Sequence, residues 1–194
     1  MKLLQEKFYA RNTELVAREL LRKILVHKSF RGKIVETEAY FGAKDPASRA
    51  FGGKKTKLNA GMWDGPGKVF VYTVHANEMF NTVTGQEGEP AAVLIRAVEP
   101  WREIGEMFRN RRIRNKKIIK IEQLCSGPGK RSQCFKIDKR LQGADVTKLG
   151  DIFVLDNVEI FQIESSHRIG VSRDLRRSYG FILKEIGLYQ GNGR

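Results

Sequence analysis

Residues 33–42 have the sequence KIVETEAYFG, and this stretch decides the expected fold. Its alternating side chains and β-branched residues predict a β-strand. A period of two places Glu36, Glu38 and Tyr40 on one face and the side chains between them on the other. Two carboxylates about 6.7 Å apart on one strand face fit a solvated surface with ordinary salt bridges, or a site that uses them. The spacing alone leaves both interpretations open.

The composition indicates a polyanionic partner. The chain has 194 residues, enough for one domain, or at most two small ones, with a buried core. It contains 36 Lys and Arg against 22 Asp and Glu, so the formal net charge is +14. Such an excess favours binding to nucleic acid or to an anionic membrane surface. Since we find neither about 18 consecutive apolar residues nor an apolar signal core, we expect a soluble intracellular protein that does not span a membrane.

The cysteines and histidines do not predict a metal site or a disulfide framework. Cys125 and Cys134 are too far apart for a Cys-x-x-Cys site, and the three histidines show no ligand spacing. Two thiols in an intracellular protein are expected to be reduced.

A long connection and a hairpin follow the strand. Residues 42–67 are rich in Gly, Pro, Lys, Asp and Ser, and a loop of about 25 residues in a compact domain is usually functional. Lys54 and Lys55 lie there beside two glycines, which suits phosphate contact and equally suits a solvated loop. Residues 69–75 and 80–84 predict a hairpin with its turn at 76–79.

Residues 91–98 predict a buried strand that is interrupted by one charge, Arg96. A guanidinium inside an apolar strand needs a partner once water is removed. Glu36 or Glu38 across the sheet is the obvious partner. The alternative is that Arg96 points to solvent at the end of the strand.

Helices are expected before and after these strands. The sequence predicts Thr13 as the N-cap of an amphipathic helix. Pro100 and Trp101 are expected to open a second helix, which continues into a basic block between Arg109 and Lys120. We expect this block to bind a phosphate backbone, and the less favoured interpretation is a solvated run of charges without a partner.

The last third of the chain predicts a glycine-flanked turn and further strands. The turn at 127–130 either receives a phosphate on its backbone amides or is a plain turn. Late strands are expected at 152–155, 159–163 and 181–183. Because β-α-β alternation is missing from the pattern, we predict an α+β fold. It would be a single domain over residues 1–194 with a mainly antiparallel, curved sheet flanked by helices.

Several short blocks occur in a fixed order along the chain: Ile34–Tyr40, Asp45–Ser48, Gly61-Met62, Pro66-Gly67, Val71-Tyr72, Asn81, Val93–Pro100, Gly127–Lys130 and Arg168–Val171. In this order and at these spacings they resemble the alkyladenine (methylpurine, 3-methyladenine) DNA glycosylase family. The resemblance covers roughly residues 8 to 171.

The resemblance implies a monofunctional DNA glycosylase that flips alkylated or deaminated purines out of duplex DNA and hydrolyses the N-glycosidic bond. Glu38 would activate the attacking water and stabilise the charge that develops on the sugar, and Arg96 would hold that water and the carboxylate. Tyr40 and Tyr72 match the aromatic walls that stack on the flipped base. Asn81 matches the residue that helps to reject undamaged guanine.

The resemblance also implies the partners of the protein. Double-stranded DNA with damaged purines is the expected partner, with a protruding hairpin inserted into it and with Lys54, Lys55 and Lys130 on its backbone. No metal or other cofactor is implied, and nothing requires more than a monomer. The expected location is the cytoplasm or nucleoid of a prokaryotic cell, or the nucleus of a eukaryotic one.

Three positions depart from the family pattern. Arg49 replaces a histidine that usually forms a third pocket wall, and its charge would favour neutral lesions such as hypoxanthine or ethenoadenine over cationic methylpurines. His75 replaces the tyrosine that fills the gap left by the flipped nucleotide, and the hairpin is one residue shorter. Residues 173–177 replace the usual Ala-Gly-Glu-Trp, which leaves the C-terminal part of the DNA contact surface open.

Three other functions fit the same residues. A diverged family member could bind damaged DNA with narrowed or lost catalysis, as Arg49 and His75 indicate. A non-catalytic nucleic-acid-binding module would use its glutamates structurally. A metal-dependent nuclease using Glu36 and Glu38 is the least favoured, because no third carboxylate or histidine falls at a suitable spacing.

Overall fold

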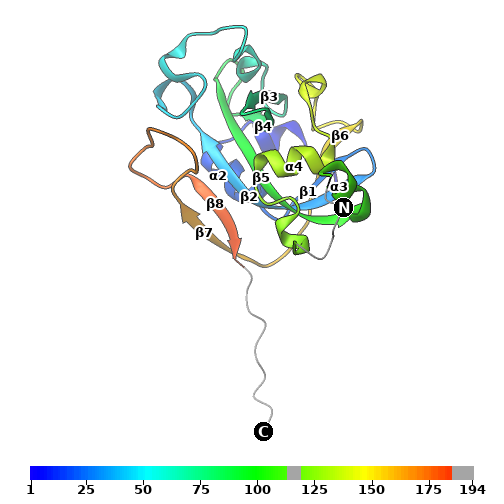
Figure 1. Ribbon diagram of the computed structural model, residues 1–194. Coiled ribbons are helices and arrows are strands. Elements are labelled where there is room, and N and C mark those ends of the chain that lie inside the picture. The colour runs from blue at the N-terminus through cyan, green and yellow to red at the C-terminus, as the bar shows by residue number, and fades with distance from the viewer. Residues whose placement is uncertain (113–118, 185–194) are drawn as a thin grey trace.

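One long strand, β2 (Phe30–Tyr40), lies in the middle of the sheet (Figure 1). In the computed structural model, which describes residues 1–112 and 119–184, β2 pairs antiparallel with β5 (Ala91–Arg102) along most of its length. On its other side β2 pairs with β1 (Ile24–His27) near its start and with β8 (Gly180–Lys184) near its end. Glu38 therefore lies on a strand that has hydrogen-bonded neighbours on both sides.

The remaining strands extend the same sheet. β3 (Val69–Val74) and β4 (Asn77–Thr84) form a hairpin, and β4 pairs with β5. β6 (Ile152–Leu155) pairs with β1, and β7 (Gln162–Ser166) pairs with β8. Within the described ranges the eight strands thus form one sheet with antiparallel pairing, which confirms the predicted α+β class.

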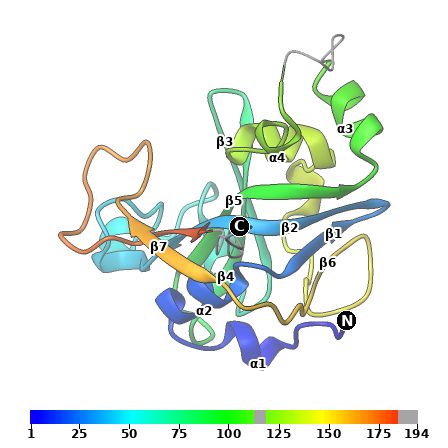
Figure 2. The ribbon, with the colours of Figure 1, turned by 90° about the horizontal axis from the view of Figure 1, so that it is seen from below.

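Helices lie on both sides of this sheet (Figure 2). α1 (Glu6–Tyr9) and α2 (Thr13–Leu20) lie on one side, and α3 (Ile104–Asn110) and α4 (Pro128–Phe135) lie on the other. Apolar side chains from the helices and the central strands meet in one large buried cluster. Among the helices of the described residues, none has the length and apolarity that a membrane crossing requires.

Short 3₁₀ helices interrupt the connections. Three of them lie in the long connection after β2, which is otherwise irregular, and two lie on either side of α4. Their bounds are Gly42–Lys44, Phe51–Gly53, Ala60–Trp63, Ile121–Gln123 and Lys139–Leu141.

The predicted N-cap of α2 is wrong by one residue. The side chain of Asn12, not of Thr13, accepts hydrogen bonds from the N–H groups of Glu14 and Leu15, at 3.0 and 3.2 Å. Thr13 is buried instead, and its hydroxyl contacts that of Thr84 at 3.1 Å. Both residue types cap helices, but only the residue before the first helical position has its side chain beside the free N–H groups.

The predicted helix start at Pro100 and Trp101 is also wrong. Both residues continue β5, because β2 extends far enough back to pair with it up to Arg102. α3 begins at Ile104 and ends at Asn110, so Arg109 is the only basic residue of that block that lies in this helix among the described residues. Residues 113–118 of that block lie outside the described residues.

Two strand boundaries differ from the prediction. The hairpin turn consists of His75 and Ala76, which have positive φ angles of 46° and 60°, and β4 begins at Asn77. A two-residue turn with positive φ at both positions matches the twist of the two strands. Asn77, Glu78 and Met79 pair with β3, so the predicted turn at 76–79 is too long. β7 begins at Gln162 and not at Glu159.

Candidate active site

The carboxylate of Glu38 is buried and meets three hydrogen-bond donors. The residue is 1% exposed. The Tyr40 hydroxyl donates to Oε2 at 2.7 Å, and the backbone N–H of Ile169 donates to Oε1 at 2.7 Å. Arg96 Nη1 lies 3.2 Å from Oε1. This glutamate is therefore oriented inside the protein and does not belong to a solvated strand face.

Arg96 connects the two glutamates of β2. Its Nε donates to Glu36 Oε1 at 2.9 Å, while Nη1 faces Glu38. The register of β2 against β5 shifts between Glu36 and Thr37, which leaves Arg96 as the extra residue of a β-bulge. Bulges redirect a side chain relative to a regular strand. The predicted pairing of Arg96 with a carboxylate is confirmed, and the solvent-facing alternative is wrong.

Burial has the largest influence on the ionisation of Glu38. It raises the pKa of the carboxyl above its ordinary value, although Arg96, the Ile169 N–H and the Tyr40 hydroxyl act in the opposite direction. Glu36 adds to the increase. Burial and the Glu38 charge also raise the pKa of Tyr40, so its hydroxyl stays a donor. A carboxylate with a raised pKa is a better proton acceptor near neutral pH than an ordinary one.

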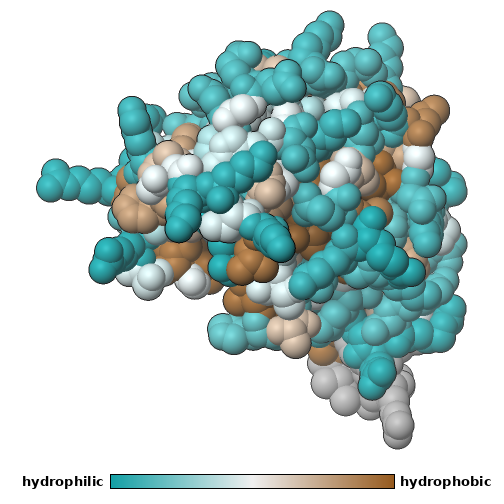
Figure 3. Space-filling view, turned by 90° about the horizontal axis from the view of Figure 1, so that it is seen from above, coloured by the Kyte–Doolittle hydropathy of each residue, from teal (hydrophilic) through white to brown (hydrophobic). Residues whose placement is uncertain are grey.

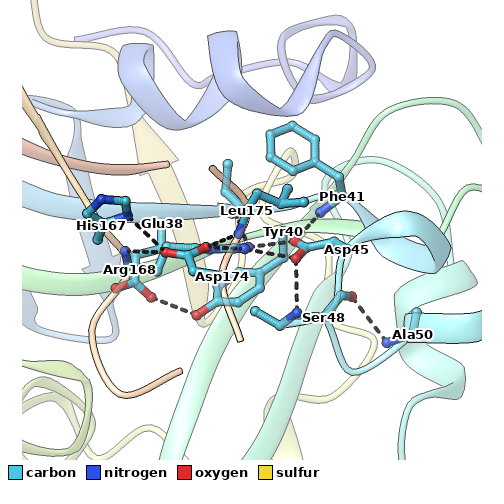
Figure 4. A network of polar contacts seen from close by, with 12 residues as sticks. Glu38, Tyr40, Phe41, Asp45, Ser48, Ala50, His167, Arg168, Asp174 and Leu175 are labelled. Carbon is cyan, nitrogen blue, oxygen red and sulfur yellow. Dashed lines mark hydrogen bonds and ion pairs between the residues drawn. The ribbon is translucent and has the colours of Figure 1, made fainter. Parts of the chain in front are cut away.

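A second buried arginine, Arg168, lies next to this group (Figure 4). Its Nη1 and Nη2 donate to the two oxygens of Asp45, at 2.5 and 2.8 Å. Nη1 also donates to the carbonyl of Ala39 at 2.9 Å. Asp174 accepts from Nε at 2.9 Å and from Nη2 at 2.6 Å. The network joins the end of β2, the connection after it and the loop between β7 and β8.

Sequence reasoning assigned no role to this network. Asp45 and Arg168 belong to blocks that carry the family resemblance, and Asp174 belongs to the segment 173–177 that departs from the family pattern. Asp45 and Arg168 are 123 positions apart, and no periodic pattern connects residues at that separation. The available signal was the residue type alone, because buried arginines need carboxylate partners.

The residues predicted to bind the base surround a small cavity. Tyr40, Arg49, Tyr72 and Asn81 line it together with apolar side chains, and its volume is about 10 Å³. The guanidinium carbon of Arg49 lies 4.5 Å from the centre of the Tyr72 ring. The four residues are therefore brought together. With Arg49 stacked on Tyr72, however, the cavity has room for about one water molecule.

A larger groove borders this cavity. It has a volume of about 790 Å³, and Arg49 and Tyr72 line both spaces. Lys54, Lys57 and Lys139 add positive charge to its walls. Among the described residues that line it, Asp64 is the one carboxylate, so the groove is positively charged overall and suits a phosphate backbone.

The other predicted DNA contacts lie on the surface. His75 is exposed at the hairpin tip, and Lys54 and Lys55 are exposed in the long connection. Lys130 is exposed in the first turn of α4, with its Nζ 3.3 Å from Ser126 Oγ. Hydrophilic side chains cover most of the face drawn in Figure 3, with smaller hydrophobic patches between them.

Cys125 and Cys134 are both free and buried. In the part of the chain that the structure describes, no group of three or more His, Cys, Asp or Glu lies close enough together to hold a metal ion.

The chain is similar in sequence to proteins of one family. The profile of the family described as Methylpurine-DNA glycosylase (MPG) matches residues 7–186. Relatives named "Putative 3-methyladenine DNA glycosylase" occur in Clostridium tetani (strain Massachusetts / E88), Desulfitobacterium hafniense (strain Y51) and Clostridium novyi (strain NT). They are 41% identical over 180 residues, 40% over 180 and 38% over 178. The matches cover 87%, 88% and 88% of both chains, respectively.

Proposed function

Because this chain belongs to the methylpurine-DNA glycosylase family and is thus a DNA glycosylase for alkylated bases, we propose that it hydrolyses the N-glycosidic bond of purines flipped out of duplex DNA. We extend the proposed substrates to deaminated purines such as hypoxanthine. The observation that carries the proposal is the Glu38 carboxylate, which is buried and meets three donors. One of these donors, the Tyr40 hydroxyl, belongs to a residue that lines the aromatic cavity.

Glu38 is proposed to act on the attacking water. As the water oxygen bonds to C1′ of the sugar, the bond from C1′ to the base nitrogen breaks and the base leaves with the electron pair. Glu38 takes the proton that the water loses. The carboxylate also stabilises the positive charge on the sugar during bond breaking. Arg96, which Glu36 holds in place, would orient both the carboxylate and the water.

Base binding in this proposal requires Arg49 to leave its position on Tyr72. A purine cannot enter a space of about 10 Å³, so it has to replace the guanidinium on the ring face. Tyr40 and Tyr72 would then stack on the base, at about 1–3 kcal/mol per base. Asn81, whose Nδ2 is held by two backbone carbonyls at 3.0 Å, would present a fixed edge that rejects guanine.

The charge of Arg49 makes the substrate range testable. Because a nearby cation repels cationic 3- or 7-methylpurines, we expect neutral hypoxanthine or ethenoadenine to be favoured. Excision rates on hypoxanthine and 7-methylguanine duplexes are measured for the wild type and for Arg49→His. The ratio is expected to shift toward 7-methylguanine in the variant. Equal ratios in both proteins would contradict this preference.

Contacts with duplex DNA are proposed for the surface residues. His75, at the exposed hairpin tip, would enter the gap left by the flipped nucleotide. Lys54, Lys55 and Lys130 would contact phosphates, so the affinity should fall steeply as salt rises. A monomer is sufficient for this arrangement, and a DNA substrate would place the protein with the chromosome.

The decisive experiment uses a panel of lesion-containing duplexes. The wild type is expected to produce breaks only after alkali or heat, with or without EDTA. Glu38→Gln should bind the same duplexes but excise at least about 100-fold more slowly. Glu99→Gln is the matched control and should excise at the wild-type rate, because Glu99 pairs with Lys33 between the same two strands and leaves both contacts of Arg96 intact.

Each alternative function has its own outcome. Breaks without alkali that stop in EDTA would indicate a nuclease. Salt-dependent DNA binding without base release would indicate a binding module or a member that has lost catalysis. Full activity of Glu38→Gln would exclude the proposed role of Glu38.

A further inference from the structure

The loop between β7 and β8 carries the backbone amide that contacts Glu38. The Ile169 N–H donates to Glu38 Oε1 at 2.7 Å, although Ile169 itself is 57% exposed. A largely exposed side chain cannot hold this amide in place, and residues 167–175 form neither helix nor strand. Contacts on either side of Ile169 must therefore fix the segment.

Arg168 provides the attachment to the sheet. Its fully buried side chain donates to the carbonyl of Ala39, the residue that follows Glu38 on β2. The same guanidinium donates to both oxygens of Asp45, whose side chain is also fully buried. Arg168 is thus bound to the residue next to Glu38, and the following residue, Ile169, donates its amide to Glu38 itself.

Asp174 closes the loop on itself. Its Oδ1 accepts from Arg168 Nε and Nη2 and from the N–H of Leu175, at 2.9, 2.6 and 2.8 Å. Its Oδ2 accepts from the N–H of Arg168 at 3.1 Å. One carboxylate therefore holds the side chain and the backbone of Arg168 together with the far end of the loop.

We propose that Asp174 is a positioning residue that, through Arg168, keeps the Ile169 N–H directed at Glu38 Oε1. The inference rests on the proposed function of Glu38. Asp174 contacts Arg168, Leu175 and, at 3.6 Å from its Oδ2, the exposed ring of His167, all within its own loop. It therefore acts through Arg168 and not on the reacting atoms.

The expected effect is on the ionisation of Glu38. The hydrogen bond from the Ile169 N–H favours the ionised form of Glu38. Burial already raises the pKa of Glu38 above its ordinary value, and losing this hydrogen bond should raise it further. β8 places only Gly180 opposite Glu38, so it adds no charge there. The other titratable groups that face Glu38 are Glu36 and Tyr40 on β2, Arg96 on β5 and Tyr72 on β3, and all four lie outside the loop that carries Asp174.

The first test measures this ionisation directly. Side-chain carboxyl signals of ¹³C-labelled glutamates are titrated by NMR in the full chain, and Glu38→Gln identifies the Glu38 signal. We expect the Glu38 pKa to be higher in Asp174→Ala than in the wild type, and Asp174→Glu to restore it in part. Asp156→Ala is the matched control, because Asp156 also pairs with a buried cation, Lys23. An unchanged Glu38 pKa in folded Asp174→Ala would overturn the proposal.

The second test follows base release against pH under single-turnover conditions, on a hypoxanthine duplex. In Asp174→Ala the acid limb of the rate profile should move to higher pH. At pH values below this limb the rate of base release should be about tenfold lower than in the wild type, and at pH values above it the two rates should be equal. A loss that is equal at all pH values and follows the unfolded fraction would overturn the proposal. If the wild type itself releases no base, the proposed function fails, and the NMR titration still decides the role of Asp174.

Discussion

Arg131 and Arg168 both have fully buried side chains, yet their surroundings are opposite. Arg168 contacts the carboxylates of Asp45 and Asp174 and a backbone carbonyl. Arg131, on α4, has no hydrogen-bond partner for Nε, Nη1 or Nη2 within residues 1–112 and 119–184. Its guanidinium carbon lies 5.2 Å from the centre of the Phe80 ring.

The same difference is seen in the ionisation of the two side chains. Burial lowers the pKa of both, but the hydrogen bonds and charges of Asp45 and Asp174 reverse this for Arg168 and raise its pKa. Burial lowers the pKa of Arg131 to about 9, because the two nearby thiols, Cys125 and Cys134, oppose it only weakly. The desolvation of a buried cation is therefore compensated where carboxylates are buried with it, beside the candidate site, and is left uncompensated at Arg131.

Arg168→Met should have the largest effect on stability. The substitution leaves the buried carboxylate of Asp45 without its cation, and removing one partner of a buried pair costs about 3–5 kcal/mol. Urea denaturation measures the free energy of unfolding. Arg140→Met, which removes an exposed pair with Asp138, is the control and should leave stability unchanged. Equal effects of the two variants would contradict a larger contribution of the buried pair.

Arg131→Met should act in the opposite direction. Methionine has a similar length and no charge, so it fills the same space without an unpaired guanidinium. We expect a gain of about 1–3 kcal/mol in the free energy of unfolding, measured in the same denaturation series. A destabilised variant would mean that an anion or ordered water accompanies Arg131 in solution.

Glu38→Gln should give a smaller gain that depends on pH. Because the pKa of Glu38 is raised, the folded protein binds this proton more tightly than the unfolded chain does. Stability therefore falls as the pH rises from the ordinary glutamate value through the higher pKa of Glu38. The variant lacks this loss, so its Tm at pH 7 should exceed that of the wild type by about 2–4 °C. Calorimetry should show the gain vanishing near about pH 4. A gain that is equal at every pH would contradict the raised pKa.

The part of the site that local sequence patterns control was predictable. Alternation along residues 33–42 was sufficient to place Glu36, Glu38 and Tyr40 on one face. The desolvation cost of Arg96 indicated a carboxylate partner but left a solvent-facing side chain equally open, and only the structure distinguishes the two. The bulge that directs Arg96 was not predictable, because a bulge is a property of two paired strands.

Contacts between distant segments account for the rest. The bond between Asp45 and Arg168, like the burial of Arg131, depends on how separate elements pack together. In the sequence Gly129-Lys130-Arg131-Ser132, the arginine is indistinguishable from a surface residue. The errors at Thr13 and Pro100 have a different cause, since each residue type suits both the predicted and the observed position.

The pairing of Asp45 with Arg168 also affects the order of assembly during synthesis. Strands β3 to β7 are made between these two residues, so Asp45 leaves the ribosome long before its cation does. Closing so long a loop costs chain entropy before the contact forms. Glu38 therefore acquires its third donor only when the nascent chain has been extended past Ile169, and a chain arrested earlier carries this carboxylate without the Ile169 amide.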